Sequence, residues 1–168
     1  MRNLFSDCSS LTSLDLCNIN AENAYSINNM FFNCHSLVSI SLSNFNTKNA
    51  RSLTNMFYSC SSLTSLNLSY FNTQSFTDIS FMFYGCSSLT SIDLSNFSDN
   101  SITSINRMFN GCSNLAYIDI SSFSKTYYYY YSLFDDNKPS NGIIIVKDET
   151  IEKQIKQYIP EWAFKYKN

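Results

Sequence analysis

The sequence predicts a β-rich solenoid, in which one short structural unit repeats and stacks on its own copies. The first observation is a fixed spacing of cysteines, which stand at positions 8, 34, 60, 86 and 112, each 26 residues after the one before. A Met-Phe or Leu-Phe pair begins four residues before every one of these cysteines. Self-similarity at a fixed period of about 20–50 residues is typical of proteins built from stacked repeats.

Alternating apolar residues predict one short strand in each repeat. Counted from the cysteine, positions +3, +6, +8 and +11 are apolar in all five repeats and give the pattern L-x-x-L-x-L-x-x-F. Polar residues between these positions produce the two-residue period of a strand. We expect each strand to pair in parallel with the same strand of the next repeat. The second half of each repeat is expected to return the chain through a short strand and a helical turn.

The predicted fold is therefore a leucine-rich-repeat solenoid, a right-handed stack whose short parallel strands form one sheet face. We place the solenoid at residues 1–146. Its repeats lie at about 4–29, 30–55, 56–81, 82–107 and 108–132, with a degenerate sixth at 133–146. In the sixth, Asn137 replaces the expected cysteine, and Ile143–Val146 is the predicted last strand. The run of tyrosines at 127–131 can fill the core or form an interface.

Residues 147–168 predict a helical cap at the C-terminal end of the stack. Asp148 can N-cap a helix that continues to about Ile159, before Pro160. With Trp162, this helix is expected to cover the last repeat, since the end of a solenoid otherwise exposes apolar surface. The N-terminal end has no comparable cap, because the sequence begins within a repeat, at Leu4. We expect either further repeats before Met1 or end-to-end self-association.

The composition excludes several classes of partner. The formal net charge is −2 and only 14% of residues are charged, so the sequence gives no reason to expect nucleic-acid binding. No apolar stretch is long enough to insert into a membrane. No signal peptide is present, but a chain that begins within a repeat says little about its compartment.

Two stretches of the sequence, MFYSCSSLTSLNLSYFNT and MFYGCSSLTSIDLSNFSD, resemble the BspA-like leucine-rich repeat family. The 26-residue repeats of that family follow M-F-x-x-C-x-S-L-x-x-L-D-L-S-x-F-x-T, and the resemblance covers residues 4 to about 134. It implies a non-catalytic, surface-exposed array of the kind found in bacteria, mollicutes and protozoa. Such arrays are thought to adhere to host matrix proteins or to other cells. The resemblance implies a class of function and no particular ligand.

The cysteines and the single histidine do not predict a catalytic or metal site. Parallel stacking points the Cβ atoms of the cysteine column in one direction, which disfavours disulfides and favours buried structural thiols. Zinc would need four convergent ligands, and neither a C-x-x-C pair nor histidine partners occur. Cys17 lies on the predicted strand and is expected to be exposed. His35 has no paired acid or nucleophile, so we expect no enzyme, cofactor or metal.

The outward side of the strands is the candidate binding surface. Positions +5, +7 and +9 alternate with the buried residues, and solenoids commonly bind partners on such an extended face. The alternative is a sheet face that serves solubility alone. The candidate partner-binding residues are Asp15, Ser41, Ser65, Asn67, Ser91, Asp93, Tyr117 and Asp119.

The expected function is a surface-displayed binding or adhesion module that recognises a protein or glycan partner through the strand side. This places the chain at the cell surface or outside the cell. The alternative is an intracellular, cytoplasmic leucine-rich-repeat scaffold for protein–protein interaction. Six cysteines without an evident disulfide pattern suit a reducing compartment at least as well as an oxidising one.

Overall fold

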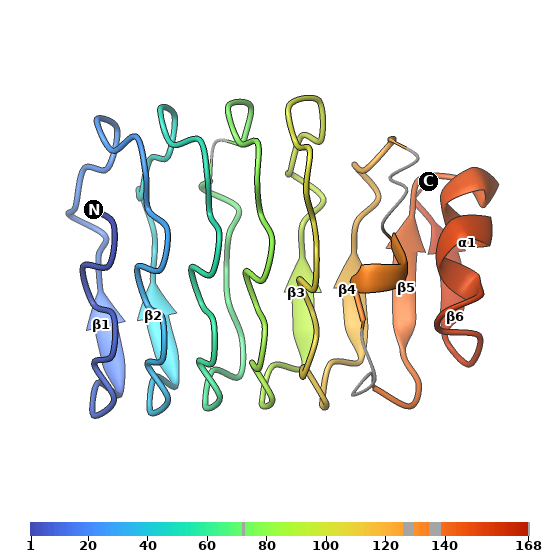
Figure 1. Ribbon diagram of the computed structural model, residues 1–168, viewed down its shortest axis with the longest axis horizontal. Helices are drawn as coiled ribbons and strands as arrows, with labels where there is room; N and C mark the ends of the chain where they lie inside the picture. Colours follow the sequence, from blue (N-terminus) through green and yellow to red (C-terminus); the bar gives the residue numbers. More distant parts are fainter. Residues whose placement is uncertain (72, 126–129, 135–138, 168) are drawn as a thin grey trace.

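The computed structural model describes residues 1–71, 73–125, 130–134 and 139–167. Its elements, in chain order, are β1 (Ser13–Asp15), β2 (Ser39–Ser41), β3 (Ser91–Asp93), β4 (Tyr117–Asp119), the 3₁₀ helix η1 (Tyr130–Ser132), β5 (Ile143–Val146), α1 (Glu149–Lys156) and β6 (Ala163–Tyr166). Successive turns of chain lie side by side along the long axis, from β1 at one end to α1 and β6 at the other (Figure 1). This β-rich arrangement is consistent, at a coarse level, with a repeat solenoid.

The strands pair as the spacing of the repeats predicts. β1 pairs in parallel with β2, and β3 with β4, so that Leu14 lies opposite Ile40 and Ile92 opposite Ile118. Each pair joins the same position of neighbouring repeats. The pairing is interrupted in the third repeat, where residues 65–67 form no strand. The described strands therefore make a two-stranded sheet, β1–β2, and a four-stranded sheet, β3–β4–β5–β6.

The predicted helical turn before each cysteine is a tight non-helical turn instead. Two positions per repeat have positive φ angles, which right-handed helices do not contain. They are Asn3, Asn29, Asn55, Phe81 and Arg107 at one position and Asp7, Asn33, Ser59, Gly85 and Gly111 at the other. Asn, Asp and Gly tolerate this conformation best, which explains most of these residues. The predicted return strand is reduced to isolated parallel bridges that join Ser52 to Asp78 and Asp78 to Ser104.

The core is built from columns of apolar side chains that hold the same position in successive repeats. A stack of phenylalanine rings runs the length of the molecule, with centroids 5.4–6.0 Å apart, and ends on Trp162. Its members are Phe5, Phe31, Phe57, Phe83, Phe109 and Phe134. In the degenerate repeat, Leu133 O accepts a hydrogen bond from Phe109 N–H. In the repeat before it, Met108 O accepts the equivalent bond from Phe83 N–H. Leu133 thus takes the place of the methionine in the earlier repeats.

The cysteine column is a buried ladder of thiols, as predicted, except at its first member. Each buried thiol donates to the carbonyl of the phenylalanine in the preceding repeat, at 3.0–3.1 Å. These thiols belong to Cys34, Cys60, Cys86 and Cys112, while Cys8 is exposed and Cys17 half-buried. All six are free thiols.

The C-terminal end differs from the prediction in two respects. Asp148 does cap α1, with Oδ1 accepting from the N–H groups of Thr150 and Ile151 at 2.9 and 3.2 Å. However, α1 ends at Lys156 and not near Ile159. The chain then forms β6, which the sequence analysis did not predict. β6 pairs in parallel with β5, so β5 is not the last strand.

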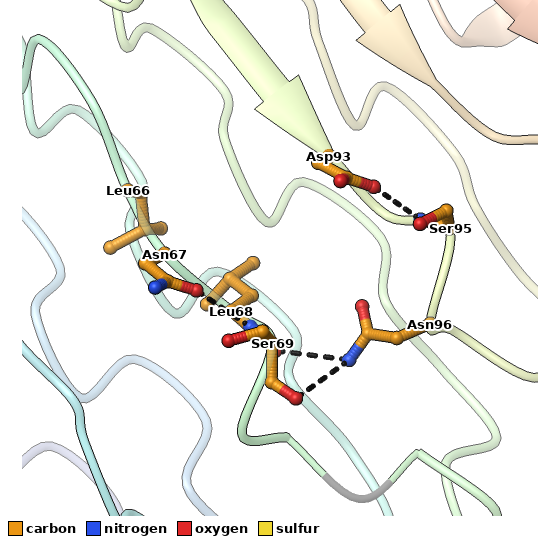
Figure 2. A pocket seen from close by; sticks show the side chains of 7 residues that line it. All are labelled: Leu66, Asn67, Leu68, Ser69, Asp93, Ser95 and Asn96. Carbon is orange, nitrogen blue, oxygen red and sulfur yellow. Dashed lines mark hydrogen bonds between the residues drawn. The ribbon is translucent and has the colours of Figure 1, made fainter.

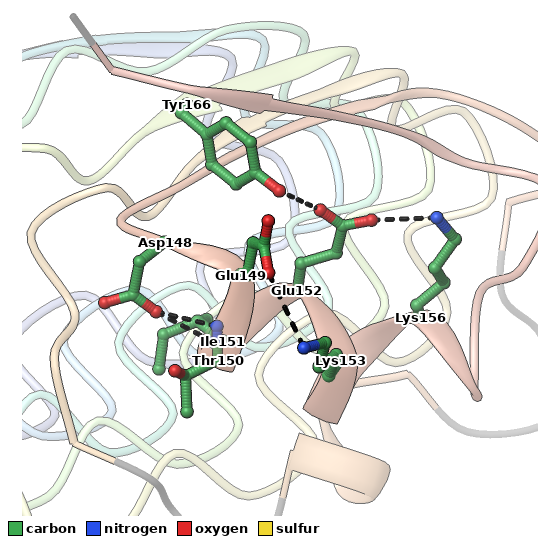
Figure 3. Close-up of polar contacts among 8 residues, drawn as sticks. All are labelled: Asp148, Glu149, Thr150, Ile151, Glu152, Lys153, Lys156 and Tyr166. Carbon is green, nitrogen blue, oxygen red and sulfur yellow. Dashed lines mark hydrogen bonds and ion pairs between the residues drawn. The ribbon is translucent and has the colours of Figure 1, made fainter.

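Helix and strand together close this end. Glu152 on α1 accepts from the Tyr166 hydroxyl of β6, and it also pairs with Lys156 at 2.8 Å (Figure 3). Trp162, between α1 and β6, is buried and donates to the carbonyl of Pro139 at 3.3 Å. The cap is therefore a helix–strand unit held on the sheet by backbone pairing.

Parts of two predictions lie outside the described residues, namely the tyrosines at 127–129 and Asn137. Tyr130 is buried, and its hydroxyl donates to Lys125 O at 3.1 Å, which supports a core role for that tyrosine. No helix among the described residues is long and apolar enough to cross a bilayer.

Candidate binding face

The outward side of the strands, positions +5, +7 and +9 of each repeat, is here called the strand face. Six of the eight candidate residues are exposed on it: Asp15, Ser65, Asn67, Ser91, Asp93 and Tyr117. Ser41 is half-buried. Asp119 retains only 6% of its surface in contact with solvent, so it is poorly accessible to a partner. The strand face is thus mostly polar and accessible, with one buried carboxylate.

The residues at position +7 have a structural role that the sequence analysis missed. In four repeats the side-chain Oδ1 accepts from the backbone N–H two residues later, at 2.8–2.9 Å, and closes a local turn at the end of the strand. The four residues are Asp15, Asn67, Asp93 and Asp119. The bond from Cys17 N–H lowers the pKa of Asp15 below its ordinary value. Only the second polar atom is left for a partner in Asn67 and Asp93, whereas that of Asp119 pairs with Lys167.

Four candidate residues gather at β3 and β4. Asp93 lies directly opposite Asp119 in the parallel register, and Tyr117 lies opposite Ser91. Burial raises the pKa of the Tyr117 hydroxyl, and the nearby Asp119 and Asp93 carboxylates add to this shift. Lys167 Nζ lies 3.9 Å from Asp119 Oδ2 and partly neutralises the buried carboxylate. Tyr117 remains 38% exposed and is the large aromatic side chain of this region.

A cleft of about 300 Å³ opens in the strand face between the third and fourth repeats (Figure 2). It is lined by Leu66, Asn67, Leu68, Ser69, Asp93, Ser95 and Asn96. The cleft lies where the two sheets are separated by the third repeat, whose residues 65–67 form no strand. Two predicted candidates, Asn67 and Asp93, stand on its opposite sides. The structure adds the leucines, serines and Asn96 to them.

Asn96 joins the two repeats at the end of the cleft. Its Nδ2 donates to Leu68 O at 3.1 Å and lies 3.4 Å from the carbonyls of Ser69 and Phe71. A second hollow, of about 360 Å³, shares Asn96 with the cleft. It is lined by Tyr70, Phe71, Thr73, Gln74, Asn96 and Ser98. Tyr70 stands at position +10, where the first, second and fourth repeats have asparagine. This departure from the repeat pattern is the feature of the sequence that could have pointed to the second hollow.

Several polar atoms of the cleft make no intramolecular hydrogen bond within the described residues. They include the Asn67 Nδ2 donor and the Asp93 Oδ2 acceptor, since Oδ1 of each residue is held by its own turn, and the hydroxyls of Ser69 and Ser95. Ligand pockets generally combine apolar walls with a few polar groups of this kind. Among the described residues, no three His, Cys, Asp or Glu side chains gather as a metal site would require.

A family model described as "Mycoplasma protein of unknown function, DUF285" matches residues 1–125. The chain belongs to the DUF285 family. The DUF285 match includes the cleft and the buried thiol column, and it is consistent with a family of repeat proteins. The C-terminal cap lies beyond the matched DUF285 region. Neither the curated proteins nor the solved structures gave a match.

Proposed function

We propose that this DUF285 chain is a non-catalytic binding module that recognises a protein or glycan partner at the cell surface through its strand face. The observation that carries the proposal is the cleft between the third and fourth repeats, with Asn67 Nδ2 and Asp93 Oδ2 available to a ligand. Sugar hydroxyls and peptide groups both donate and accept hydrogen bonds, so an amide donor beside a carboxylate acceptor suits either class.

The proposal includes a finer assignment of the repeats, as a right-handed leucine-rich-repeat solenoid of the BspA-like type. It is supported by the L-x-x-L-x-L-x-x-F columns, whose members are largely buried, and by parallel pairing between positions 26 residues apart. In such an array the stacking residues are shared by all repeats. Specificity would then arise from positions that vary, such as Asn67 and Tyr70.

Several features support a non-catalytic role. His35, the only histidine, is exposed, and its backbone groups alone make hydrogen bonds within the described residues. Burial raises the pKa of Cys34 to about 11 and that of Cys112 to about 12. The hydrogen bond to the Asp15 carboxylate raises the pKa of Cys17. These thiols are protonated at neutral pH and are poor nucleophiles.

The test is binding to matrix proteins and to arrayed glycans by variants that keep the local turns. Asn67→Asp removes the Nδ2 donor, and Asp93→Asn removes the negative charge, while both retain the Oδ1 acceptor. We expect the double variant to bind the recognised partner at least about tenfold more weakly, because a hydrogen bond to a charged group is lost together with a neutral one. Lys48→Ala, an exposed change outside both hollows, is the control and should bind normally.

A matched thermal unfolding curve shows that the double variant is folded. Unchanged binding by a folded Asn67→Asp, Asp93→Asn variant would remove the cleft from the binding site. Equal loss of binding in the Lys48→Ala control would show that the assay does not report on the strand face.

One observation favours a second candidate, an intracellular scaffold for protein–protein interaction. All six cysteines are free, and Cys8 is exposed to solvent. Exposed thiols persist most readily in reducing compartments. Protease treatment of intact cells distinguishes the two candidates. A surface module should be degraded while the cell remains closed, whereas a cytoplasmic scaffold should survive until the cell is lysed.

A further inference from the structure

Two hollows of the surface adjoin each other and share one residue. The cleft between the third and fourth repeats has a volume of about 300 Å³, and the second hollow has a volume of about 360 Å³. Each is at the lower end of the ~300–1,000 Å³ range of small-ligand sites. Asn96 lines both hollows, with Asn67 and Asp93 in the cleft and Tyr70 in the second hollow (Figure 2). A ligand that passes Asn96 can therefore occupy both.

Tyr70 interrupts a set of hydrogen bonds between neighbouring repeats. Side chains at position +10 of the fourth and fifth repeats donate to backbone carbonyls of the repeat before. Asn96 Nδ2 donates to Leu68 O at 3.1 Å, and Ser122 Oγ donates to Phe97 O at 2.6 Å. At this position of the third repeat, Tyr70 makes no such bond within the described residues and is 51% exposed. The third repeat thus has an exposed ring where its neighbours have a structural hydrogen bond.

The faces of the Tyr70 ring are not covered by another aromatic ring in the part of the chain that the structure describes. By contrast, the rings of Tyr58 and Tyr84 stack at 4.6 Å and cover each other. An uncovered ring that carries a hydroxyl suits a ligand with both an apolar face and polar groups. A pyranose sugar is such a ligand, because its C–H bonds form an apolar face and hydroxyls surround its edge.

The polar atoms of the two hollows suit the hydroxyls of a sugar. Asn67 Nδ2 and Asp93 Oδ2 are available in the cleft, and the Ser98 hydroxyl in the second hollow makes no hydrogen bond within the described chain. Carbonyls of the third repeat hold Asn96 Nδ2, which leaves Oδ1 as an acceptor where the hollows meet. Each sugar hydroxyl both donates and accepts, so it can use donors and acceptors of this kind together.

The backbone of the third repeat favours a sugar over a peptide strand. Residues 65–67 form no strand, and within the described residues no backbone hydrogen bond joins them to β2 or β3. A peptide that adds to a sheet needs a free edge along which it can lie. Residues 65–67 belong to the repeat between β2 and β3, so the row of repeats continues on both sides of them (Figure 1). A hydroxyl is small enough to reach single N–H or C=O groups in such a gap.

The charge of the lining residues limits the class of sugar. The described residues that line the two hollows include one carboxylate, Asp93, and neither lysine nor arginine. A sialylated or sulfated sugar would place its own negative charge near Asp93 without a cation to compensate it, and such a juxtaposition of like charges is unfavourable. The site therefore suits a neutral sugar.

We propose that the two hollows form one site for a neutral oligosaccharide. One sugar unit lies in the cleft and bonds to Asn67 and Asp93, and the chain of sugars passes Asn96 so that another unit stacks on Tyr70. This inference rests on the proposed function and makes it more specific, because that proposal includes protein and glycan partners alike.

The test is calorimetric titration of the chain with neutral sugars, from monosaccharides to tetrasaccharides of glucose, galactose, mannose and N-acetylglucosamine. The recognised tetrasaccharide should bind at least about tenfold more tightly than its monosaccharide, because it reaches both hollows. Tyr70→Asn introduces the residue that three other repeats have at this position and should remove that gain. Tyr70→Phe keeps the ring and should retain the gain.

Tyr25→Ala is the matched control, because Tyr25 is 73% exposed and lines neither hollow. It should bind the tetrasaccharide as the wild type does, and thermal unfolding shows that each variant is folded. Failure of every neutral sugar to bind up to about 10 mM overturns the inference. Tetrasaccharide binding that is unchanged in folded Tyr70→Asn also overturns it, as does tighter binding of a sialylated or sulfated sugar than of its neutral counterpart.

Binding of a matrix protein separates this inference from the proposed function. A matrix protein that binds the wild type but not the Asn67→Asp, Asp93→Asn variant, while all neutral sugars fail to bind, overturns the oligosaccharide site alone and leaves the cleft as a protein-binding site. If the folded double variant binds every partner as the wild type does, the proposed function and the oligosaccharide site are both wrong.

Discussion

At the scale of single residues, the environment of a side chain depends on its position within the repeat and on how close that repeat lies to an end of the molecule. Cys60 and Cys86 have neighbours on both sides, and burial raises the pKa of both thiols well above the ordinary value. Cys8 stands in the same column and is exposed, because no described repeat precedes it. One residue type therefore has two chemical behaviours in one chain.

This contrast predicts the order of thiol modification. In the native protein at neutral pH, Cys8 should react first with a disulfide reagent and Cys17 more slowly, because its pKa is raised by the hydrogen bond to Asp15. The four buried thiols should react only as the protein unfolds. Mass spectrometry of the modified peptides over time measures the order. Reaction of Cys60 or Cys86 before unfolding would contradict the buried ladder.

The contact between the cap residues Tyr166 and Glu152 predicts a dependence of stability on pH. The bond raises the pKa of Tyr166 to about 12. The pKa of Glu152 is lowered, first by its hydrogen bond to Lys156 and then by the one to Tyr166. A raised tyrosine pKa stabilises the fold fully below the unfolded value of about 10 and loses this contribution as the pH rises toward 12. The Glu152 carboxylate, whose pKa is lowered, stabilises the fold above about pH 4.3, and this contribution is lost as the pH falls.

Tyr166→Phe is the variant that tests this dependence. It should remove the most alkaline step from the tyrosinate absorbance titration and flatten the unfolding temperature between about pH 10 and 12. Tyr25→Phe, at a largely exposed tyrosine, serves as the control. An alkaline step that persists in Tyr166→Phe would show that Glu152 does not hold the hydroxyl.

At the scale of elements, the sequence predicts features that depend on local pattern and misses those that depend on distant partners. The alternation around Leu14 and Ile40 places two strands correctly, and Asp148 marks the start of α1. The same alternation at Leu66 predicts a strand that the structure lacks, because periodicity measures which side chains are buried and not whether the backbone is paired. β6 was missed because the four residues AFKY carry too little alternation to identify a strand.

The candidate binding site likewise contains residues that a local pattern predicts and residues whose role depends on distant partners. Strand periodicity identifies Asn67 and Asp93 as outward residues, and both line the cleft. Asn96 was missed, because its role depends on carbonyls 25 to 28 residues earlier in the chain. The ion pair of Asp119 joins it to Lys167, which lies near the C-terminal end of the sequence. Contacts between residues so far apart in the sequence produce no periodic pattern in it.

The phenylalanine stack predicts a large loss of stability when it is interrupted. Phe83 is fully buried between Phe57 and Phe109, with ring centroids 6.0 and 5.8 Å away. Phe83→Ala should lower the free energy of unfolding by about 3–5 kcal/mol, because it removes a buried ring and leaves a cavity. Chemical denaturation measures the change. A decrease in the free energy of unfolding below about 1 kcal/mol would show that the stack contributes little to stability.

At the scale of the whole molecule, similar repeats build a surface that is regular except where a repeat departs from the shared pattern. The third repeat departs twice, through its missing strand and through Tyr70, and both departures border Asn96. The phenylalanine stack is shared by all the repeats, so these departures are what make one place on the surface different from the others. A partner that contacts only the shared positions could not tell one repeat from the next.

Hydrogen exchange of the chain with and without its bound partner tests this account most directly. The account predicts that binding slows exchange in residues 65–69 and 91–96, on the two sides of the cleft. Residues 51–54 and 77–80, on the return side of the same repeats, should exchange at the same rate in both samples. Protection of the return side, with the cleft unchanged, would contradict the assignment of binding to the strand face.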